Sequence, residues 1–290
     1  KERTNLERHD FYQYDKYQKI SMAINNITPE ELQGSLFSSS PWLLGQVEVS
    51  EYNNQFVLPI SVDETASTHL YRRHPATTRD LVRGQTTRGI SKLIQTGDVF
   101  NTMAKDIFCD IDLYDDQVTF LQKRFPSPIG STAISFYHFY IEDTVAVAGD
   151  SCIRLQFMPA NNQDFGFRGE LYVLNDSSLH VRRCVMQMPH GTGVNFVQSI
   201  RFEQEFEQLP NGDWALTTDN MVAELQLTSL IQRAMVVRTT RLDNYAFDPI
   251  DDRLFRGHTE TVYEPQAKTR DERTLAQRAS DARSGASALA

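Results

Sequence analysis

Cysteine is scarce in this chain of 290 residues, which has only three: Cys109, Cys152 and Cys184. They form no CxxC pair and no spacing typical of a metal site. Cys152 and Cys184 fall two strands apart in the sheet predicted below, which separates their Cα atoms by ~9–10 Å at ~4.8 Å per strand step. A disulfide needs less than ~7 Å. We therefore predict three free cysteines, a count that defines no compartment.

Long apolar runs and an excess of basic residues are also missing. No run approaches the ~20 apolar residues that a membrane helix requires. The formal net charge of −9 disfavours non-specific binding to nucleic acid, which depends on Lys and Arg neutralising phosphates. The chain starts at Lys1 rather than at Met. We therefore expect a soluble piece excised from a longer protein, with no nucleic-acid partner.

Catalytic and metal-binding motifs are missing as well. GxSxG, HExxH, the P-loop and GxGxxG do not occur. The glycines of residues 190–193 are interpreted as a strand connection, and Arg182-Arg183 as part of a solvated strand face. The aspartates of residues 110–116 lack the central Gly and the distant Glu of an EF-hand, so they predict an acidic turn. We therefore predict no enzyme activity, no cofactor and no metal site.

What the sequence does contain is a series of strand-like segments over residues 136–245. In residues 196–207, aromatic side chains such as Phe202 fall on even positions and acidic ones such as Glu203 on odd positions. Alternate side chains of a strand point to opposite faces, so this segment has one apolar and one charged face. An Asn-Gly turn at residues 211–212 predicts a hairpin. Seven such segments, separated by turn signals, predict one curved antiparallel sheet.

The strand after this turn changes phase. Trp214 and Leu216 are apolar on even positions, whereas the apolar set from Met221 onward is odd. A slip of one residue near 217–220 predicts a bulge, and a sheet that curls needs such bends. On this interpretation Trp214 faces the inside of the sheet and lies diagonal to Phe206.

The first part of the chain predicts further strands. Residues 11–24 alternate and predict the first strand. Residues 43–49 and 56–60 flank a turn and predict a hairpin. Two more strand candidates, at 67–73 and 80–87, are separated by His-Pro.

Helices are few. Residues 28–31 read as a helix start, with a cap, a Pro and two acids. Residues 90–108 approach helical spacing, with Asp98 as a cap, and this helix would fill the concave side of the sheet. We predict an α+β fold: a mostly antiparallel curved sheet, or half-open barrel, wrapped around one or more short helices. Residues 1–265 form this β-rich domain, and residues 266–290 a charged, Ala-rich tail or linker.

Short motifs in a fixed order resemble a known family. They are Tyr17-Gln18-Lys19-Ile20, Leu58-Pro59-Ile60-Ser61-Val62-Asp63-Glu64-Thr65, Phe125-Pro126-Ser127-Pro128-Ile129, Phe139-Tyr140-Ile141-Glu142-Asp143-Thr144, Phe157-Met158-Pro159, Phe167-Arg168-Gly169-Glu170-Leu171-Tyr172-Val173, Val194-Asn195-Phe196-Val197 and Asp213-Trp214. The set resembles a domain of unknown function in Gram-negative outer-membrane proteins. There it stands between a carboxypeptidase-regulatory-like β-sandwich and a surface-antigen-type β-barrel. The resemblance covers residues 6–264, and the tail after Thr269 departs from it.

This resemblance implies a fold like that of the lipoprotein carrier LolA, a half-open antiparallel barrel around helices that holds acyl chains in an apolar cavity. It also implies a place on the periplasmic side of the outer membrane. The implied partners are a lipid or lipoprotein, the adjacent domains of the parent protein and other envelope proteins. No catalytic residue is carried over.

Two functions stay open. The first is a non-enzymatic periplasmic domain that binds or relays an amphiphile, which is an acyl chain, a lipid or a lipoprotein. The second is a structural or protein-interaction module that links envelope domains. For the first function the apolar face offers these lining residues: Phe157, Phe167, Leu171, Phe196, Phe202, Trp214 and Met221. The alternative for the same residues is a solid core that leaves no cavity.

Overall fold

The structure is a computed structural model that describes residues 6–34, 38–89, 110–120, 123–161, 166–188, 197–226, 233–257 and 259–267. The strands are β1 (Phe11–Ile24), β2 (Glu48–Val49), β3 (Phe56–Arg72), β4 (Thr77–Gly89), β5 (Gln117–Phe120), β6 (Lys123–Pro126), β7 (Tyr137–Val147), β8 (Asp150–Pro159), β9 (Arg168–Leu174), β10 (Val181–Met188), β11 (Val197–Gln208), β12 (Trp214–Leu225), β13 (Ala234–Ala246) and β14 (Thr261–Tyr263). The helices are α1 (Pro29–Leu32), α4 (Ala133–Phe136) and 3₁₀ helices at Leu6–Arg8, Pro41–Gln46 and Asp252–Phe255. The described chain is therefore mostly strand, with a few short helices.

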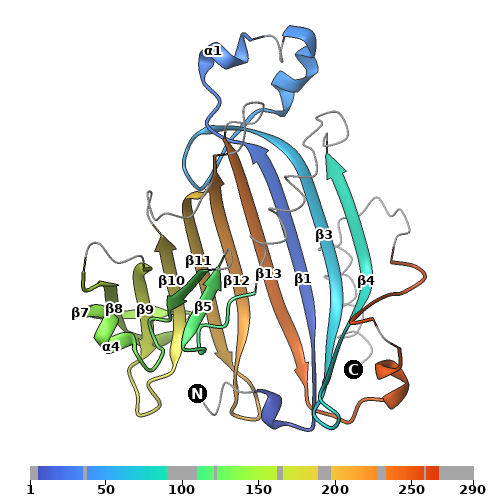
Figure 1. Cartoon of the computed structure of the whole chain (residues 1–290), viewed down its shortest axis with the longest axis vertical. Coiled ribbons are helices and arrows are strands. Elements are labelled where there is room, and N and C mark those ends of the chain that lie inside the picture. The colour runs from blue at the N-terminus through green and yellow to red at the C-terminus, as the bar shows by residue number, and fades with distance from the viewer. Residues whose placement is uncertain are drawn as a thin grey trace.

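One large sheet dominates the described chain (Figure 1). Its 12 strands follow the order β14-β4-β3-β1-β13-β12-β11-β10-β9-β8-β7, with β2 beside β3. Pairing is antiparallel between all neighbours except β14 and β4, which are parallel. β7 and β14 stand at opposite ends of this order, so the sheet does not close on itself. Figure 1 shows that it is curved.

The run of seven strands predicted over residues 136–245 is confirmed as β7 to β13, each paired with the next. The first strand is confirmed at Phe11–Ile24, where β1 pairs with both β13 and β3. The predicted bulge is confirmed too. Glu205 pairs with Thr218 whereas Phe206 pairs with Leu216, so one extra residue stands in β12 between these pairs.

Two expectations for the first part of the chain are wrong. Residues 56–60 and 67–72 belong to a single strand of 17 residues, β3. Its Pro59 lies at a register shift against β1, where the missing N–H is tolerated. Residues 43–46 form no strand, because Pro41 begins a 3₁₀ helix that runs to Gln46. The predicted hairpin is reduced to β2 pairing with the start of β3.

The helix start predicted at residues 28–31 is confirmed as α1, which lies beyond one end of the sheet (Figure 1). Thr28 and Glu31 form a capping box. The backbone N–H of Glu31 donates to Thr28 Oγ1 at 3.2 Å, and the N–H of Thr28 donates to Glu31 Oε2 at 2.7 Å. These two bonds satisfy N–H groups that a helix start leaves without intrahelical partners.

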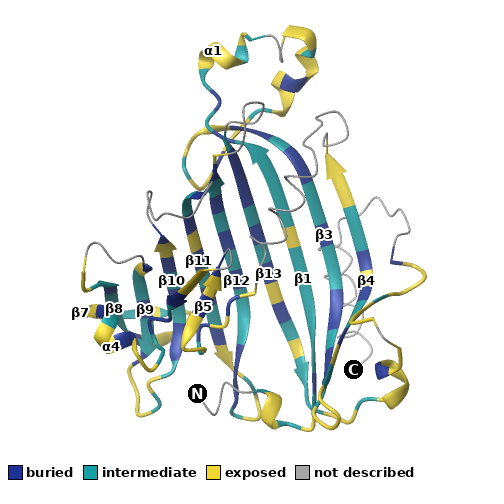
Figure 2. Ribbon diagram, in the orientation of Figure 1, coloured by how far each residue is buried: buried dark blue, intermediate teal, exposed yellow. Residues whose placement is uncertain are grey.

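We use the term covered face for the side of β8–β13 that packs against the β5–β6 hairpin and residues 110–116. Phe120 of the hairpin packs edge-on against Phe202 with ring centroids 5.7 Å apart, and Phe125 packs likewise against Phe167 at 5.4 Å. Buried positions alternate with less buried ones along β11 and β12 (Figure 2). The described filler of this face is therefore mainly a β-hairpin with the one-turn α4. The helix predicted over 90–108 lies outside the described residues.

Cys152 and Cys184 are free, as predicted. Both are buried, and burial raises the pKa of both thiols. Cys109 lies outside the described residues. At the other end of the sheet, Ala267 is buried and its carbonyl accepts from the N–H of Gln85 at 2.8 Å. The described fold thus continues to residue 267, and the rest of the predicted tail lies outside the description. No helix in the described ranges is long and apolar enough to cross a membrane.

Candidate functional site: a tyrosine-lined cavity on the covered face

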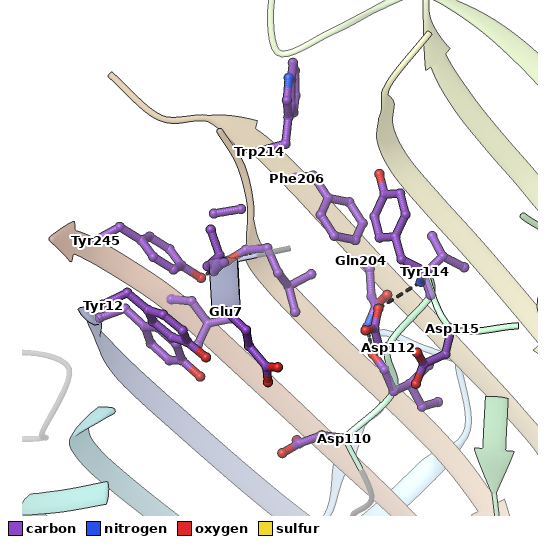
Figure 3. Close-up of a pocket in the computed structure, with 17 residues that line it drawn as sticks. Glu7, Tyr12, Asp110, Asp112, Tyr114, Asp115, Gln204, Phe206, Trp214 and Tyr245 are labelled. Carbon is purple, nitrogen blue, oxygen red and sulfur yellow. Dashed lines mark hydrogen bonds between the residues drawn. The ribbon is translucent and has the colours of Figure 1, made fainter. Parts of the chain in front are cut away.

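A cavity of about 570 Å³ lies where β1, β11, β12 and β13 meet residues 110–115 and the 3₁₀ helix Leu6–Arg8 (Figure 3). Its lining residues are Leu6, Glu7, Tyr12, Tyr14, Asp110, Ile111, Asp112, Leu113, Tyr114, Asp115, Gln204, Phe206, Trp214, Ala215, Leu216, Leu242 and Tyr245. We call it the tyrosine-lined cavity. Its walls come from the beginning, the middle and the end of the chain.

One wall consists of tyrosines from β1 and β13. Tyr12 and Tyr14 stand two residues apart on β1 and therefore share a face. Tyr12 stacks on Tyr71 at 4.6 Å, and Tyr14 stacks on His69 at 4.8 Å. Burial raises the pKa of the Tyr12 and Tyr14 phenols. These side chains therefore present neutral aromatic surface at ordinary pH.

Tyr245 joins this wall because of a local irregularity in β13. Gln13 pairs with Ala246 but Asp15 pairs with Asp243, so β13 contains one extra residue there. Asn244 takes up the change with a positive φ of 54°. Tyr245 thereby reaches the cavity, and its ring centroid lies 5.0 Å from that of Tyr14. Its hydroxyl donates to the carbonyl of Leu216 at 2.6 Å.

The opposite wall combines β11 and β12 with residues 110–115. Tyr114 packs edge-on against Phe206 at 5.4 Å, and Trp214 stacks on His180 at 5.1 Å. Figure 3 shows Tyr12 and Tyr245 on one side of the cavity and Tyr114 and Phe206 on the other. An apolar group between the two walls would contact aromatic rings on both sides.

Asp213 fastens the N-terminal segment to the cavity. It follows the Asn-Gly turn, and its side chain is 1% exposed. Its carboxylate accepts from Arg8, from His9 Nε2 at 2.6 Å and from Asn211 Nδ2 at 2.9 Å. The motif Asp213-Trp214 thus has a local explanation, since the first residue holds the 3₁₀ helix and the second lines the cavity.

Carboxylates supply most of the cavity's charge. Among the described residues that line the cavity, Glu7, Asp110, Asp112 and Asp115 are acidic and none is Lys, Arg or His. Asp112 also shapes the local turn, because its Oδ1 accepts from the N–H of Tyr114 at 2.8 Å. This agrees with the predicted acidic turn. No group of His, Cys, Asp and Glu in the described ranges is arranged to hold a metal ion.

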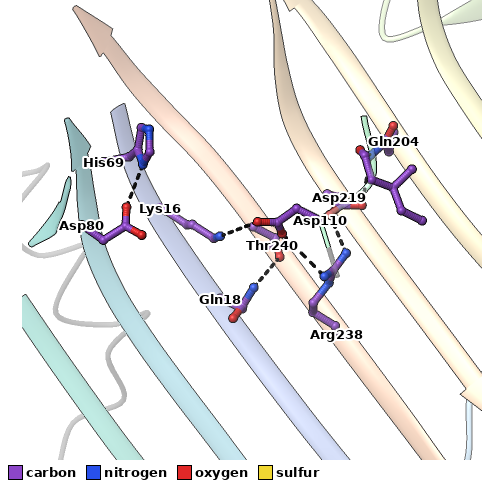
Figure 4. Close-up of polar contacts among 10 residues, drawn as sticks. Lys16, Gln18, His69, Asp80, Asp110, Gln204, Asp219, Arg238 and Thr240 are labelled. Atoms are coloured by element: carbon purple, nitrogen blue, oxygen red, sulfur yellow. Dashed lines mark hydrogen bonds and ion pairs between the residues drawn. The ribbon is translucent and has the colours of Figure 1, made fainter. Parts of the chain in front are cut away.

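A buried polar network continues the cavity along the covered face (Figure 4). Arg238 of β13 has a side chain with 0% exposure and donates to Asp219 Oδ2 of β12 at 2.6 Å. Gln204 Nε2 donates to the carbonyl of Ile111 at 2.7 Å and links the network to the cavity wall. Burial raises the pKa of Asp219, while the Arg238 charge opposes that rise.

The structure places the predicted lining residues in two groups. Trp214 lines the cavity and is buried, as predicted. Phe196 lies outside the described residues. The other five are at most 2% exposed and pack in the core rather than at this cavity, so their role in binding stays a prediction: Phe157, Phe167, Leu171, Phe202 and Met221.

Sequence reasoning missed the tyrosine wall and the role of Glu7. A signal for Tyr12 and Tyr14 existed, because both fall on one face of the predicted first strand. No local signal indicates that this strand meets residues 110–115. That contact depends on the pairing of β1 with β13, which is about 220 residues away in the chain.

The strand pairing and the cavity define a protein of the curved, unclosed antiparallel-sheet class. The chain belongs to a family of unknown function (DUF5686), and the sequence pattern of this family matches residues 1–238. This membership agrees with the family resemblance of the motifs. The neighbouring sandwich and barrel stay predictions. No curated protein matches the sequence.

Two solved structures show a distant likeness. A DUF1329 family protein from Desulfovibrio piger has 12% identity and a TM-score of 0.28, with 86% of this chain and 90% of that chain covered. A LolA superfamily protein from Nitrosomonas europaea has 8% identity and a TM-score of 0.22, with 86% and 91% covered. The scores are low, so the fold is defined here by the strand pairing.

Proposed function

We propose that the chain is a non-enzymatic domain that binds or relays an amphiphile in the tyrosine-lined cavity. The cavity itself supports this proposal. Its volume is about 570 Å³, and aromatic and leucine side chains line it together with a few carboxylates. Ligand sites are typically concave and mostly apolar, with a small number of polar groups. An acyl chain would lie between the aromatic walls, and its polar end would face the carboxylates.

The setting is part of the same proposal. We infer a periplasmic domain at the outer membrane, because the ordered motifs resemble a domain found in Gram-negative outer-membrane proteins. A lipid or a lipoprotein would then be the amphiphile, and the adjacent domains of the parent protein would be its nearest partners.

Isothermal titration calorimetry with single-chain amphiphiles of increasing length tests the proposal. We expect saturable one-to-one binding to the wild-type chain. Leu216→Trp, which adds volume inside the cavity, should weaken it, whereas Leu254→Trp, on a side chain 41% exposed outside the cavity, should not. Thermal unfolding of both variants controls for folding. Binding that is absent at every chain length, or unaffected by Leu216→Trp, would contradict the proposal.

A second function, an interaction module between envelope domains, is favoured by one surface feature. Large apolar side chains lie exposed at the end of the sheet near α1: Trp42, Leu44, Val49, Tyr52 and Phe56. Clustered apolar exposure marks interaction sites more often than isolated apolar residues do. Binding of a purified neighbouring domain that is lost in a Trp42→Ser and Phe56→Ser variant, with amphiphile binding unchanged, would support this function.

A further inference from the structure

The two edges of the large sheet differ in how they are covered. At one edge, β14 pairs with β4, and Arg79 of β4 donates to the carbonyls of Phe255 at 3.3 Å and Gly257 at 2.9 Å. At the other edge, β7 pairs with β8 (Figure 1). Among the described residues, no strand pairs with the other side of β7, which we call the outer edge. An edge strand offers its backbone N–H and C=O groups to a further strand.

The pairing with β8 identifies which residues of β7 direct their backbone groups to the outer edge. The carbonyl of Phe136 accepts from the N–H of Ala160 at 2.8 Å, one step before the β7–β8 ladder. In an antiparallel ladder, hydrogen-bonded pairs alternate with pairs that are not hydrogen-bonded. Alternate residues from His138 onward therefore bond to β8, whereas Phe139 and Ile141 direct their N–H and C=O groups outward.

The first half of β7 is apolar where it is exposed. Residues 139–141 are Phe-Tyr-Ile, and Ile141 is 76% exposed. The register against β8 shifts after this residue, and the next two residues, Glu142 and Asp143, each lie 2.9 Å from Arg154 Nε. Bulges and charges protect a sheet edge from a further strand. Here they protect only the second half of β7, so the first half offers an apolar edge.

This first half is complementary to itself. When two copies run antiparallel with Tyr140 opposite Tyr140, Phe139 of each copy stands opposite Ile141 of the other. Both residues direct their backbone groups outward, so they can exchange two backbone hydrogen bonds. The same register places His138 opposite Glu142. Apolar side chains therefore meet apolar ones, and no two carboxylates face each other.

We propose that two copies of the chain associate through the outer edges of β7, which joins their two sheets into one. The interface has twofold symmetry, because the same strand of each copy forms it. A second copy is the occupant that the self-complementary pattern of residues 138–142 favours. The inference is independent of amphiphile binding, since β7 contributes no residue to the lining of the tyrosine-lined cavity.

Sedimentation velocity at protein concentrations from about 1 µM to about 1 mM tests the association. We expect a reversible equilibrium between one and two copies. Ile141→Lys places a charge on the outer edge and should raise the dissociation constant about tenfold or more. The control, Leu254→Lys, changes a side chain that is 41% exposed near the opposite edge of the sheet, and it should leave the constant unchanged. Circular dichroism checks that both variants fold.

Disulfide trapping tests the register. The background is Cys109→Ser, in which the two remaining cysteines are buried. Tyr140→Cys should form a disulfide between copies under mild oxidation, because opposite residues without mutual hydrogen bonds have Cα atoms ~4.5 Å apart, within the span of a disulfide. Thr144→Cys should not, because the proposed register separates the two copies of this residue by ~25 Å.

Each result decides the proposal. A chain that stays a single copy over the whole concentration range overturns it. A dimer that Ile141→Lys leaves unchanged, or that Leu254→Lys weakens as much, forms through another surface and overturns it too. Trapping through Thr144→Cys rather than Tyr140→Cys overturns the register and with it the proposed pairing. Amphiphile binding is measured separately by calorimetry, so failure of this inference leaves the proposed function standing.

Discussion

At the scale of single residues, the turn before β12 shows how a short motif can serve a site. Asn211 and Gly212 form the turn, with Gly212 at a φ of 85°, and Asp213 and Trp214 then enter the cavity region. Trp214 pairs with Gln208, two residues along β11 from Phe206, so it lies diagonal to Phe206 as the sequence predicted. Turn chemistry and alternation are local, so this part of the site was predictable.

Trp214→Ala should cost ~3–5 kcal/mol of stability, as expected for an aromatic side chain removed from a buried position. Trp214 is 5% exposed and its ring stacks on His180. The urea midpoint of each variant, followed by circular dichroism, checks this. Trp42→Ala, at a position 51% exposed, is the control and should stay within ~0.5 kcal/mol. An unchanged midpoint in Trp214→Ala would refute the inward placement.

Other residues could not be placed from the sequence. Arg182 was interpreted as solvated, but it is 4% exposed and donates to the carbonyl of Phe206 at 2.6 Å and to Asp150 at 3.0 Å. Its neighbour Arg183 pairs with Glu203 and stays partly exposed, as a strand face would. A buried arginine is tolerated only where acceptors surround it. Those acceptors lie on other strands, which local patterns do not reveal.

At the scale of elements, strand positions were easier to predict than strand continuity. β7 to β13 are separated by turn signals, and each was found. β3 was divided into two because Pro59 and the polar stretch that follows it interrupt the apolar pattern. In the structure β3 is paired on both sides, by β1 and by β4, so sheet pairing overrides the local pattern.

The tyrosine wall predicts how stability depends on alkaline pH. Burial raises the pKa of Tyr14, so the folded state keeps this proton where the unfolded chain, with a pKa of ~10, has lost it. The free energy of unfolding should therefore fall as pH rises above ~10. Tyr14→Phe should make this fall shallower, measured by urea unfolding at a series of alkaline pH values. Tyr140→Phe, 48% exposed, should not. Equal slopes in all three proteins would contradict the burial of the phenol.

The Arg238–Asp219 pair between β12 and β13 predicts a non-additive effect. Arg238→Met removes one partner and leaves a buried carboxylate, which should cost ~3–5 kcal/mol. Arg238→Met with Asp219→Leu removes both charges and should recover much of that loss. Denaturant midpoints of the two single variants and the double variant measure whether the losses of stability add. A double variant as unstable as the sum of the two single variants would show that the two groups act independently.

At the scale of the whole molecule, the cavity exists only because distant segments meet. Leu6 and Glu7, residues 110–115 and the strands β11 to β13 each contribute a wall. The sequence predicted the curved sheet and its covered face, because alternation and turns are local signals. It did not predict which residues surround the cavity, since that depends on the register of strands far apart in the chain. Family membership adds no ligand, because the family's function is unknown.

Quenching of tryptophan emission by an amphiphile with bromine atoms on its chain tests the central claim most directly, because bromine quenches only nearby rings. Two single-tryptophan proteins are compared. Trp42→Phe keeps only Trp214 in the cavity, and Trp214→Phe keeps only the exposed Trp42 near α1. If the tyrosine-lined cavity holds the chain, Trp214 emission falls saturably and Trp42 emission does not change. Quenching of Trp42 with Trp214 unaffected would contradict the account and place the amphiphile on the exposed apolar surface instead.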